Sequence, residues 1–329
     1  MRLTGQELAI ATQGVWHQGH LDDITLITTD SRNFQQGSVF LALRGDAFDG
    51  HQCAPDSASA LIGDSEGVQA WKGRHTPYLE VSDTLQALGD IAHAWREKLT
   101  QTTVIGITGS YGKTTVRSML SHLLTGLGLR VHATHANLNN VIGVPQTVLA
   151  TPIHADVALI ECGISEQGEM QRLADILSPD GVVMTGISSA HAEGLGGFQG
   201  VIQEKARLLL AIKTGGWCAL GKGVASCLQA EHINIACQTV SHAVTWTRQG
   251  LKATFHYQGE SAHVSLSLPA DHWCDNMALV LSIALEILEQ LPVSAHFHHM
   301  VTQLSTWSAV DGRLQICKGI AGCHILNDA

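Results

Sequence analysis

Positive charge is scarce in this sequence. The 329 residues include 19 Lys and Arg against 29 Asp and Glu, which gives a formal net charge of -10. A protein that binds nucleic acid needs a basic surface to meet the phosphates, and no part of this chain supplies one. We therefore expect no nucleic-acid partner. An anionic ligand must instead be met by a few locally placed Lys and Arg side chains and by helix N-termini.

Paired cysteines, a leader segment and long apolar runs are also missing. The eight cysteines are scattered without a C-x-x-C pair, which argues against zinc and against a disulfide framework and fits a reducing cytoplasm. The chain opens on polar residues rather than a signal peptide. Because no run of about 18 apolar residues occurs, we expect no membrane span. The histidines of 296–299 have no Cys or acidic company, and we interpret them as surface residues.

The composition is that of a globular protein, with 45% hydrophobic and 15% charged residues. The N-terminal part reads as a small α/β unit, followed by an amphipathic helix over 82–99. Apolar runs then alternate with helical patterns, which predicts a doubly wound parallel sheet. The expected strands are 21–29, 38–43, 104–108, 156–162 and 181–187, the expected helices are 116–124, 168–176, 198–210 and 276–288, and 218–268 and 313–327 are expected to add further strands.

A glycine-rich segment between an apolar run and a helical pattern carries the clearest chemical signal. Residues 104–115 read Val-Ile-Gly-Ile-Thr-Gly-Ser-Tyr-Gly-Lys-Thr-Thr. Glycines permit a tight turn whose N–H groups point at an anion, and the following helix directs its positive end at the same place. Lys113 supplies charge for terminal phosphates and Thr114 can hold Mg²⁺. Although Ile107 stands where the strict pattern has its first glycine, we predict a nucleoside triphosphate site.

Two more chemical side chains follow buried strands. Glu161 closes the apolar run 157–161, and His191 lies four residues after the expected strand 181–187. The carboxyl ends of parallel strands meet at one edge of a sheet, so both side chains are expected beside the phosphate loop. A carboxylate there could reach Mg²⁺ directly or through water. An acid after a strand is often only a helix cap, but the shared edge favours a metal–nucleotide site.

The roles of two further polar features cannot be decided from the residues alone. The segment Asn137-Leu-Asn-Asn-Val-Ile-Gly-Val-Pro145 enters an apolar element, and it could be either a substrate loop or an Asx turn. Lys205 lies in the helical pattern 203–207, where a solvated surface lysine is the ordinary interpretation.

In this order and at these distances, the segments 106–115, 137–145, 161–169 and His191-Ala-Glu-Gly resemble the Mur ligases. The stretch Thr29-Asp-Ser-Arg32, with 37–45 and 48–51, is similar to the UDP-sugar domain of that family. The resemblance covers nearly the whole chain. It implies an α/β protein with a small N-terminal UDP-binding domain (1–82), a P-loop ATPase domain with a mostly parallel sheet (83–308), and the start of a C-terminal domain (309–329).

The resemblance is closest to the ligases that join D-alanyl-D-alanine to UDP-N-acetylmuramoyl-tripeptide in peptidoglycan precursor synthesis. It implies that the terminal carboxylate of the peptide attacks the γ-phosphate of ATP and becomes an acyl phosphate. The amine of D-alanyl-D-alanine then displaces phosphate. ATP and Mg²⁺ are the implied cofactors, UDP-N-acetylmuramoyl-peptide and D-alanyl-D-alanine the implied partners, and we expect a cytoplasmic monomer.

The resemblance also implies a role for each matching residue. Lys113, His191 and Lys205 are implied to be catalytic, with Lys205 as a carbamate. Mg²⁺ is implied to be held by Thr114, Glu161, His191 and Lys205. The nucleotide is implied to be bound by Gly109, Ser110, Tyr111, Gly112, Lys113, Thr114, Thr115, Asn276 and Arg313, and the UDP-peptide by Ser31, Arg32, Asn137, Asn139 and Asn140.

The chain departs from the family pattern at several places. Trp273 follows His272 where asparagine is usual, Ala136 replaces a common glycine, and 311–313 reads Asp-Gly-Arg instead of Pro-Gly-Arg. The family's third domain would lie after Ala329, so we expect this chain alone to be a weak or inactive ligase that still binds its ligands. Two alternatives stay open, namely a related folate- or cyanophycin-type ligase with another acceptor and a non-catalytic paralogue that binds UDP-sugar or nucleotide.

Overall fold

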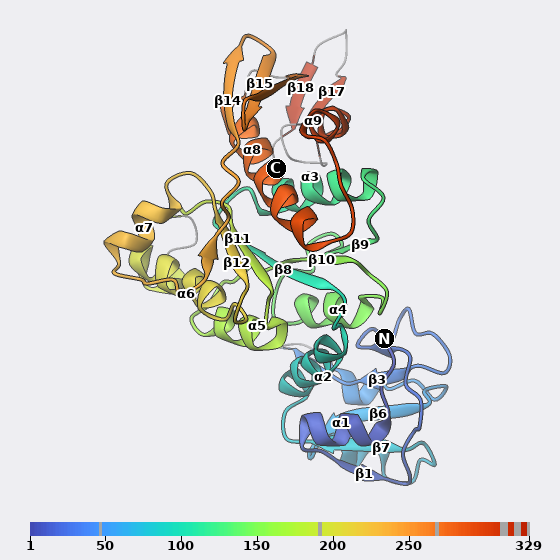
Figure 1. The fold of residues 1–329 in the computed structure, drawn as a ribbon. Helices are drawn as coiled ribbons and strands as arrows, with labels where there is room; N and C mark the ends of the chain where they lie inside the picture. The colour runs from blue at the N-terminus through green and yellow to red at the C-terminus, as the bar shows by residue number, and fades with distance from the viewer. Residues whose placement is uncertain (46–47, 190–192, 267–269, 310–314, 319–323, 328–329) are drawn as a thin grey trace. The chain divides into compact units, whose positions relative to one another are not determined.

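The computed structural model describes residues 1–45, 48–189, 193–266, 270–309, 315–318 and 324–327 (Figure 1). The chain divides into two compact units, each assembled from several stretches. Unit 1 comprises Met1–Thr102, Thr134–Ala155 and Gln171–Ser178, and unit 2 comprises Thr103–Ala133, Asp156–Met170 and Pro179–Ala329. The predicted domain boundaries after residues 82 and 308 stay a prediction. Within the described ranges, no helix has both the length and the apolar character needed to cross a bilayer.

Unit 1 is built on a five-stranded sheet in the order β1-β7-β6-β3-β2. Its strands β2, β3, β6 and β7 run parallel, and β1 joins the edge of β7 in the antiparallel sense. The expected strands 21–29 and 38–43 are shorter in the structure, because only a few residues of each form the hydrogen bonds of the sheet. The sheet strands are β1 (Val15–His17), β2 (Ile27–Thr28), β3 (Val39–Leu41), β6 (Ala60–Asp64) and β7 (Tyr78–Val81), with a separate hairpin of β4 (Arg44–Gly45) and β5 (Phe48–Asp49).

The helices of unit 1 are α1 (Gly5–Thr12), α2 (Thr84–Lys98) and α4 (Gly143–Ala150), with α5 (Glu169–Leu177) entering it from residue 171, and the short 3-10 helices are η1 (Gly50–Cys53) and η2 (Gly67–Trp71). Helix α2 begins where the carboxylate of Asp83 accepts the N–H of Gln86, as a helix N-cap does. Its buried residues at helical spacing include Leu88, Ile91 and Trp95, and the helix packs against α1 and α4. The predicted helix over 82–99 is thereby confirmed.

Unit 2 contains a six-stranded, wholly parallel sheet in the order β13-β12-β11-β8-β10-β9. The central strand β8 pairs through Gly106 with β10 on one side and β11 on the other. This register brings the carboxyl ends of these strands to one edge. The predicted α/β class is confirmed. The strands are β8 (Thr103–Thr108), β9 (Val131–Ala133), β10 (Val157–Glu161), β11 (Gly181–Met184), β12 (Trp217–Leu220) and β13 (Gln238–Thr239).

Helices connect these strands, as a parallel sheet requires. Figure 1 shows α3 and α8 beside each other, and their contact encloses a core that includes Met119, Leu123 and Leu281. Burying each such side chain contributes about 1.5–3 kcal/mol. Unit 2 contains α3 (Lys113–Gly126), α6 (Gly197–Leu210), α7 (Val224–Ala230), α8 (Asp271–Gln290), α9 (Phe297–Ser305) and the 3-10 helix η3 (Glu193–Leu195).

The region 218–268 is more varied than its composition indicated. It holds the end of β12, α7 and β13 before the predicted antiparallel strands appear as β14 (Thr245–Gln249), β15 (Lys252–Tyr257) and β16 (Glu260–Ser265). The predicted pair near the end of the chain is present as β17 (Gln315–Lys318) and β18 (His324–Asn327).

Candidate functional site

The glycine-rich loop turns sharply between β8 and α3. Gly109 has φ +146° and Gly112 has φ +81°, both in the region that favours glycine. A Cβ at Gly109 would collide with the Thr185 hydroxyl and lie 3.0 Å from the backbone of Gly186. Gly112 is the N-cap of α3, so the helix starts at Lys113 with its first N–H groups at the loop. This is the geometry of an anion-binding turn.

The loop is braced from the segment that follows β11. The N–H of Ser110 donates to the carbonyl of Gly186 at 2.7 Å, and the hydroxyl of Thr185 donates to the carbonyl of Tyr111. The Tyr111 ring lies close over Gly186, since a Cβ there would meet it. The N–H of Ser110 is therefore used inside the protein, and other N–H groups of the loop must serve an anion. The role of Thr185 was missed in the sequence, because a brace from another strand has no local signal.

A cavity of about 760 Å³ opens at the loop. This volume is within the usual range for small-molecule sites. It contains six of the loop and helix residues predicted to hold a nucleotide and also Asn276, 161 positions after Thr115 in the sequence. The structure thus brings together distant residues that the sequence assigned to one ligand. The lining residues are Ser110, Tyr111, Gly112, Lys113, Thr114, Thr115, Thr185, Gly221, Lys222, His272, Trp273, Asp275, Asn276 and Leu279.

Beside the loop, a buried carboxylate meets the first turns of α3. The Thr114 hydroxyl lies 3.1 and 3.2 Å from the two oxygens of Glu161, and Arg117 Nε donates to Oε2 at 3.2 Å. The side chain of Glu161 is 2% exposed. Arg117 was not predicted from the sequence, although its position three residues after Thr114 places both on one face of a helix. Hydroxyl and carboxylate oxygens together are suitable ligands for Mg²⁺.

Lys205 on α6 is buried, with 5% of the residue exposed. The ordinary interpretation as a solvated surface lysine is wrong. Burial, and then the nearby charge of Lys113, lower the pKa of its amine to about 8. Burial, and then the charge of Glu161, raise the pKa of the Cys162 thiol to about 12, so this thiol stays protonated. The charges of Lys113, Glu161 and Lys205 all influence the Cys162 thiol, so the three side chains contribute to the same local electrostatic field.

The loop after Glu161 is anchored by the residue that precedes Lys205. Glu204 is buried and its Oε2 accepts the N–H of Gly168 at 3.0 Å, while Oε1 accepts Nε of Arg207 at 2.9 Å. Gly168 has φ +86° and ends this loop before α5. Glu204 and Lys205 are consecutive on α6, so one helix carries both the anchor of this loop and the buried lysine. This contact was not predicted either.

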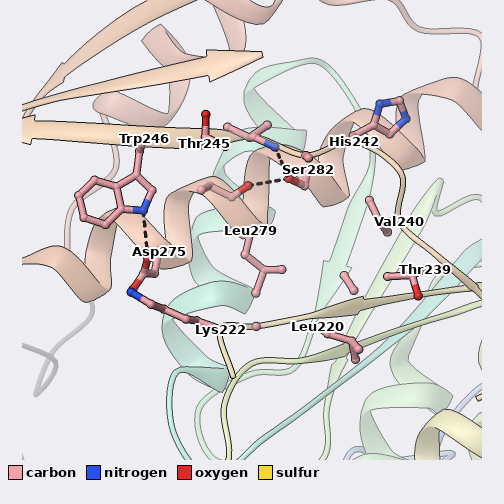
Figure 2. Close-up of a pocket in the computed structure, with 15 residues that line it drawn as sticks. Leu220, Lys222, Thr239, Val240, His242, Thr245, Trp246, Asp275, Leu279 and Ser282 are labelled. Carbon is pink, nitrogen blue, oxygen red and sulfur yellow. Dashed lines mark hydrogen bonds and ion pairs between the residues drawn. The ribbon is translucent and has the colours of Figure 1, made fainter. Parts of the chain in front are cut away.

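A second cavity of about 470 Å³ shares Gly221, Lys222, Asp275 and Leu279 with the first (Figure 2). Figure 2 shows the indole of Trp246 directed at Asp275, whose Oδ1 accepts its N–H at 3.0 Å. Lys222 Nζ lies 3.4 Å from Oδ2 of the same carboxylate. Asp275 is thus held on both oxygens at the border between the cavities. None of these residues was singled out in the sequence.

The residues predicted for the UDP-peptide lie in unit 1. Asp30 accepts the N–H of Arg32 and also the side chains of Asn33 and Arg32, and these hydrogen bonds hold its pKa at about 2. They order the turn that contains Ser31. Gln146 on α4 donates to the hydroxyl of Thr29 at 2.8 Å, which joins this turn to the helix that begins within the asparagine-rich segment.

Within the asparagine-rich segment, Asn140 forms an Asx turn. Its Oδ1 accepts the N–H groups of Ile142 and Gly143 at 3.1 and 2.9 Å, at the start of α4. The alternative of an Asx turn is therefore confirmed at Asn140. The carbonyl of Asn137 accepts the N–H of Asn139 at 2.8 Å, which keeps the turn compact. Substrate contacts of Asn137, Asn139 and Asn140 stay a prediction.

Two predicted site residues, His191 and Arg313, lie outside the described residues. In the described ranges, no group of three His, Cys, Asp or Glu side chains is placed to hold a metal ion. Of the predicted metal ligands, the described residues are Thr114, Glu161 and Lys205. Only Glu161 among them is a His, Cys, Asp or Glu side chain.

Comparison with known proteins agrees with this geometry. The model of the Mur ligase middle domain matches residues 107–284, and that of the Mur ligase family catalytic domain matches 23–96. The UDP-N-acetylmuramoyl-tripeptide–D-alanyl-D-alanine ligase of Bacillus subtilis is 38% identical over 194 residues, which are 58% of this chain and 42% of that protein. The ligase of the same name from Buchnera aphidicola subsp. Baizongia pistaciae is 30% identical over 94% of this chain and 68% of its own length.

A solved structure of MurF from Acinetobacter baumannii superposes with a TM-score of 0.85 at 29% identity and covers 100% of this chain and 73% of that one. The matched part of the chain spans about two fifths of the Bacillus subtilis relative. The family model matches more than half of the chain, and it begins inside β8 and ends inside α8, so it contains the loop, Glu161 and Lys205. This chain belongs to the Mur ligase family.

Proposed function

We propose that the chain binds ATP with Mg²⁺ and UDP-N-acetylmuramoyl-tripeptide and serves the ligation of D-alanyl-D-alanine to that peptide. The observation that carries the proposal is the convergence of the phosphate loop, the Thr114–Glu161 contact and the buried Lys205 in a member of this family. The names of its relatives support the choice of substrates. We also propose the division into parts 1–82, 83–308 and 309–329.

The loop would bind the β- and γ-phosphates of ATP through N–H groups of α3 and through Lys113. In the structure the ammonium group of Lys113 lies 2.8 Å from the carbonyl of Gly109, so the cation is already held at the loop. Preorganised charge of this kind stabilises negative charge that develops during phosphoryl transfer. Asn276, which lines the same cavity, would contact the base of the nucleotide.

The ligation needs a carboxylate to approach the γ-phosphate, and both are anions. In the proposed reaction a carboxylate oxygen of the peptide forms a bond to the γ-phosphorus and ADP leaves. The amine of D-alanyl-D-alanine then attacks the acyl carbon, loses a proton, and phosphate leaves. Lys113 would offset the negative charge, and its fixed position would keep the γ-phosphate in line with the carboxylate.

Thr114 and Glu161 would hold Mg²⁺, which supplies positive charge to the phosphate oxygens. Their oxygen atoms fit this ion better than softer metals. His191, which lies outside the described residues, and Lys205 would hold a second Mg²⁺. An amine whose pKa is lowered to about 8 by burial loses its proton more readily than an exposed lysine and in its neutral form can accept CO₂, which supports the proposal of a carbamate at Lys205.

The turn 29–33 and the asparagine-rich segment 137–145 would bind the UDP-peptide. Arg32 has a side chain that is 89% exposed and therefore accessible to a diphosphate. The hydrogen bond from Gln146 to Thr29 supports a common role for both segments, because it joins the turn to α4, which begins within the segment 137–145 in the same unit.

Isothermal titration calorimetry tests the proposal directly. The chain is titrated with a non-hydrolysable ATP analogue, with and without Mg²⁺, and then with UDP-N-acetylmuramoyl-tripeptide or with UDP-N-acetylglucosamine. We expect Mg²⁺-dependent nucleotide binding and micromolar binding of the tripeptide ligand that UDP-N-acetylglucosamine does not reproduce. A folded sample that binds the nucleotide but not the tripeptide ligand would contradict the proposed substrate and favour a ligase with another acceptor or a paralogue.

A further inference from the structure

Arg117 lies at the candidate metal site but not at the cavity. Its side chain is 13% exposed, its Nε donates to Glu161 Oε2 at 3.2 Å, and it is absent from the residues that line the cavity at the loop. Thr114 contacts the same carboxylate and does line that cavity. Arg117 therefore approaches Glu161 from the protein side, and Thr114 approaches it from the ligand side.

The contact of Arg117 with Glu161 compensates the charge of a buried carboxylate. A carboxylate that is 2% exposed has lost most of its hydration, and a buried charge without a partner costs several kcal/mol. Arg117 is placed to supply the opposite charge because it follows Thr114 by three positions on α3. A guanidinium donates in one plane and so also fixes how the carboxylate is turned.

We propose that Arg117 is a positioning residue of the metal site, which turns the Glu161 carboxylate toward the Mg²⁺ that Thr114 and Glu161 would hold. This inference rests on the proposed metal–nucleotide function. Groups that hydrogen-bond a metal-binding carboxylate orient it, and their loss weakens metal binding roughly 10- to 100-fold. Arg117 would thus influence the metal through its hydrogen bond to Glu161 and not as a ligand of the metal.

Removal of Arg117 also has an effect of the opposite sign. Arg117 carries positive charge beside a site for a cation, and charge repulsion alone would make Mg²⁺ bind more tightly when Arg117 is removed. Orientation and repulsion therefore predict shifts of opposite sign. We expect orientation to prevail because Arg117 is mostly buried and cannot move away into solvent, so its repulsion is offset at all times by Glu161.

The test uses Mn²⁺ as a spectroscopic probe for Mg²⁺. Electron paramagnetic resonance measures free Mn²⁺ during titration of the chain with the non-hydrolysable ATP analogue present. We expect Arg117→Met to weaken Mn²⁺ binding roughly 10- to 100-fold and Arg117→Lys to restore part of it. The matched control is Arg130→Met, which removes an Arg that pairs with Asp156 in the same unit at 2.6 Å, and it should leave Mn²⁺ binding unchanged.

A second cycle separates positioning from a general structural effect. If Arg117 acts through Glu161, the substitution Arg117→Met has little further effect on Mn²⁺ binding in a Glu161→Gln background, so the two changes are not additive. Full additivity, unchanged Mn²⁺ binding in Arg117→Met or tighter binding would overturn the inference. Thermal unfolding of each variant confirms that it is folded. If the unaltered chain fails to bind Mn²⁺ with the nucleotide, the proposed function itself fails.

Discussion

The ammonium group of Lys113 donates a hydrogen bond to the carbonyl oxygen of Gly109, which lies 2.8 Å away across the turn of the phosphate loop. The cation thus satisfies an acceptor of its own loop, four positions earlier in the chain. A phosphate oxygen is a stronger acceptor for an ammonium group than a neutral carbonyl. The contact keeps Lys113 at the loop, so less side-chain freedom is lost when a nucleotide binds.

Replacing Lys113 with Met removes this charge while keeping most of the side-chain length. A hydrogen bond to a charged group is worth about 1.5–3 kcal/mol, so we expect the ATP analogue to bind roughly 10- to 100-fold more weakly. Calorimetry measures the change, and the melting temperature should hardly move. Lys252→Met on β15, an exposed position, is the control. Equal losses in both variants would show that general charge, and not the loop lysine, attracts the nucleotide.

Gly109→Ala tests the shape of the loop. Both Gly109 (φ +146°) and Gly128 (φ +90°) have backbone angles that side chains rarely adopt, at a cost of about 1–3 kcal/mol, but only at Gly109 would the new Cβ meet Thr185 and Gly186. A Cβ at Gly128 would meet no atom within 4 Å, so Gly128→Ala measures the cost of the backbone angle alone. We expect the melting temperature to fall in both variants and further in Gly109→Ala, with nucleotide binding lost only there. Identical melting curves would show that the loop adapts to the methyl group.

The pH dependence of Lys205 follows from its lowered pKa. Between about pH 8 and the ordinary value of 10.5, the unfolded chain keeps a proton that the folded chain has released, so this group makes folding more favourable as pH rises. Because a carbamate forms from the neutral amine, its amount should increase with pH through the same pKa. NMR with ¹³C-labelled CO₂ is expected to show a carbamate signal that grows from about pH 7 to about pH 9.

The Lys205→Met variant is the control for that signal. It should lack the carbamate resonance and also the rise of stability with pH that the lysine produces. A signal of equal size in the variant would place the carbamate on another amine.

The parallel sheet could be predicted because strands buried on both faces leave continuous apolar runs, as in 157–161 and 181–184. The loop and Glu161 were also predictable, since a phosphate loop and an acid after a strand are local patterns. The burial of Lys205 was not, because its own helix gives no sign that Lys113 and Cys162 lie nearby. Resemblance to a family, and not periodicity, singled it out.

Contacts between distant segments account for what the sequence analysis missed. The brace from Thr185 to Tyr111 and the anchor from Glu204 to Gly168 join residues 74 and 36 positions apart. Such contacts depend on strand order, which a single sequence does not give. Arg117 is the exception, because its spacing from Thr114 is a local signal that predicts a shared helix face. Unit 1 likewise contains 134–155 and 171–178 together with the N-terminal residues, which composition alone does not indicate.

Gln146→Met examines the UDP-peptide side of the proposal. Gln146 Nε2 donates to the Thr29 hydroxyl at 2.8 Å and so holds the turn with Ser31 and Arg32 against α4. Loss of one such hydrogen bond is worth about 0.5–1.5 kcal/mol, so we expect UDP-N-acetylmuramoyl-tripeptide to bind roughly 2- to 10-fold more weakly. Binding of the ATP analogue should not change, because the residues that line its cavity belong to unit 2.

Gln69→Met is the matched control for Gln146→Met. Gln69 Nε2 donates to the Ser65 carbonyl at 3.0 Å in the same unit, so the substitution removes a similar hydrogen bond at an exposed position away from the turn. Calorimetry measures the tripeptide affinity of both variants, each of which has lost one hydrogen bond donated by a glutamine side chain. A weaker tripeptide affinity in Gln146→Met alone would tie the turn 29–33 to the ligand. Equal affinity in the two variants would mean that the turn keeps its shape through the hydrogen bonds of Asp30.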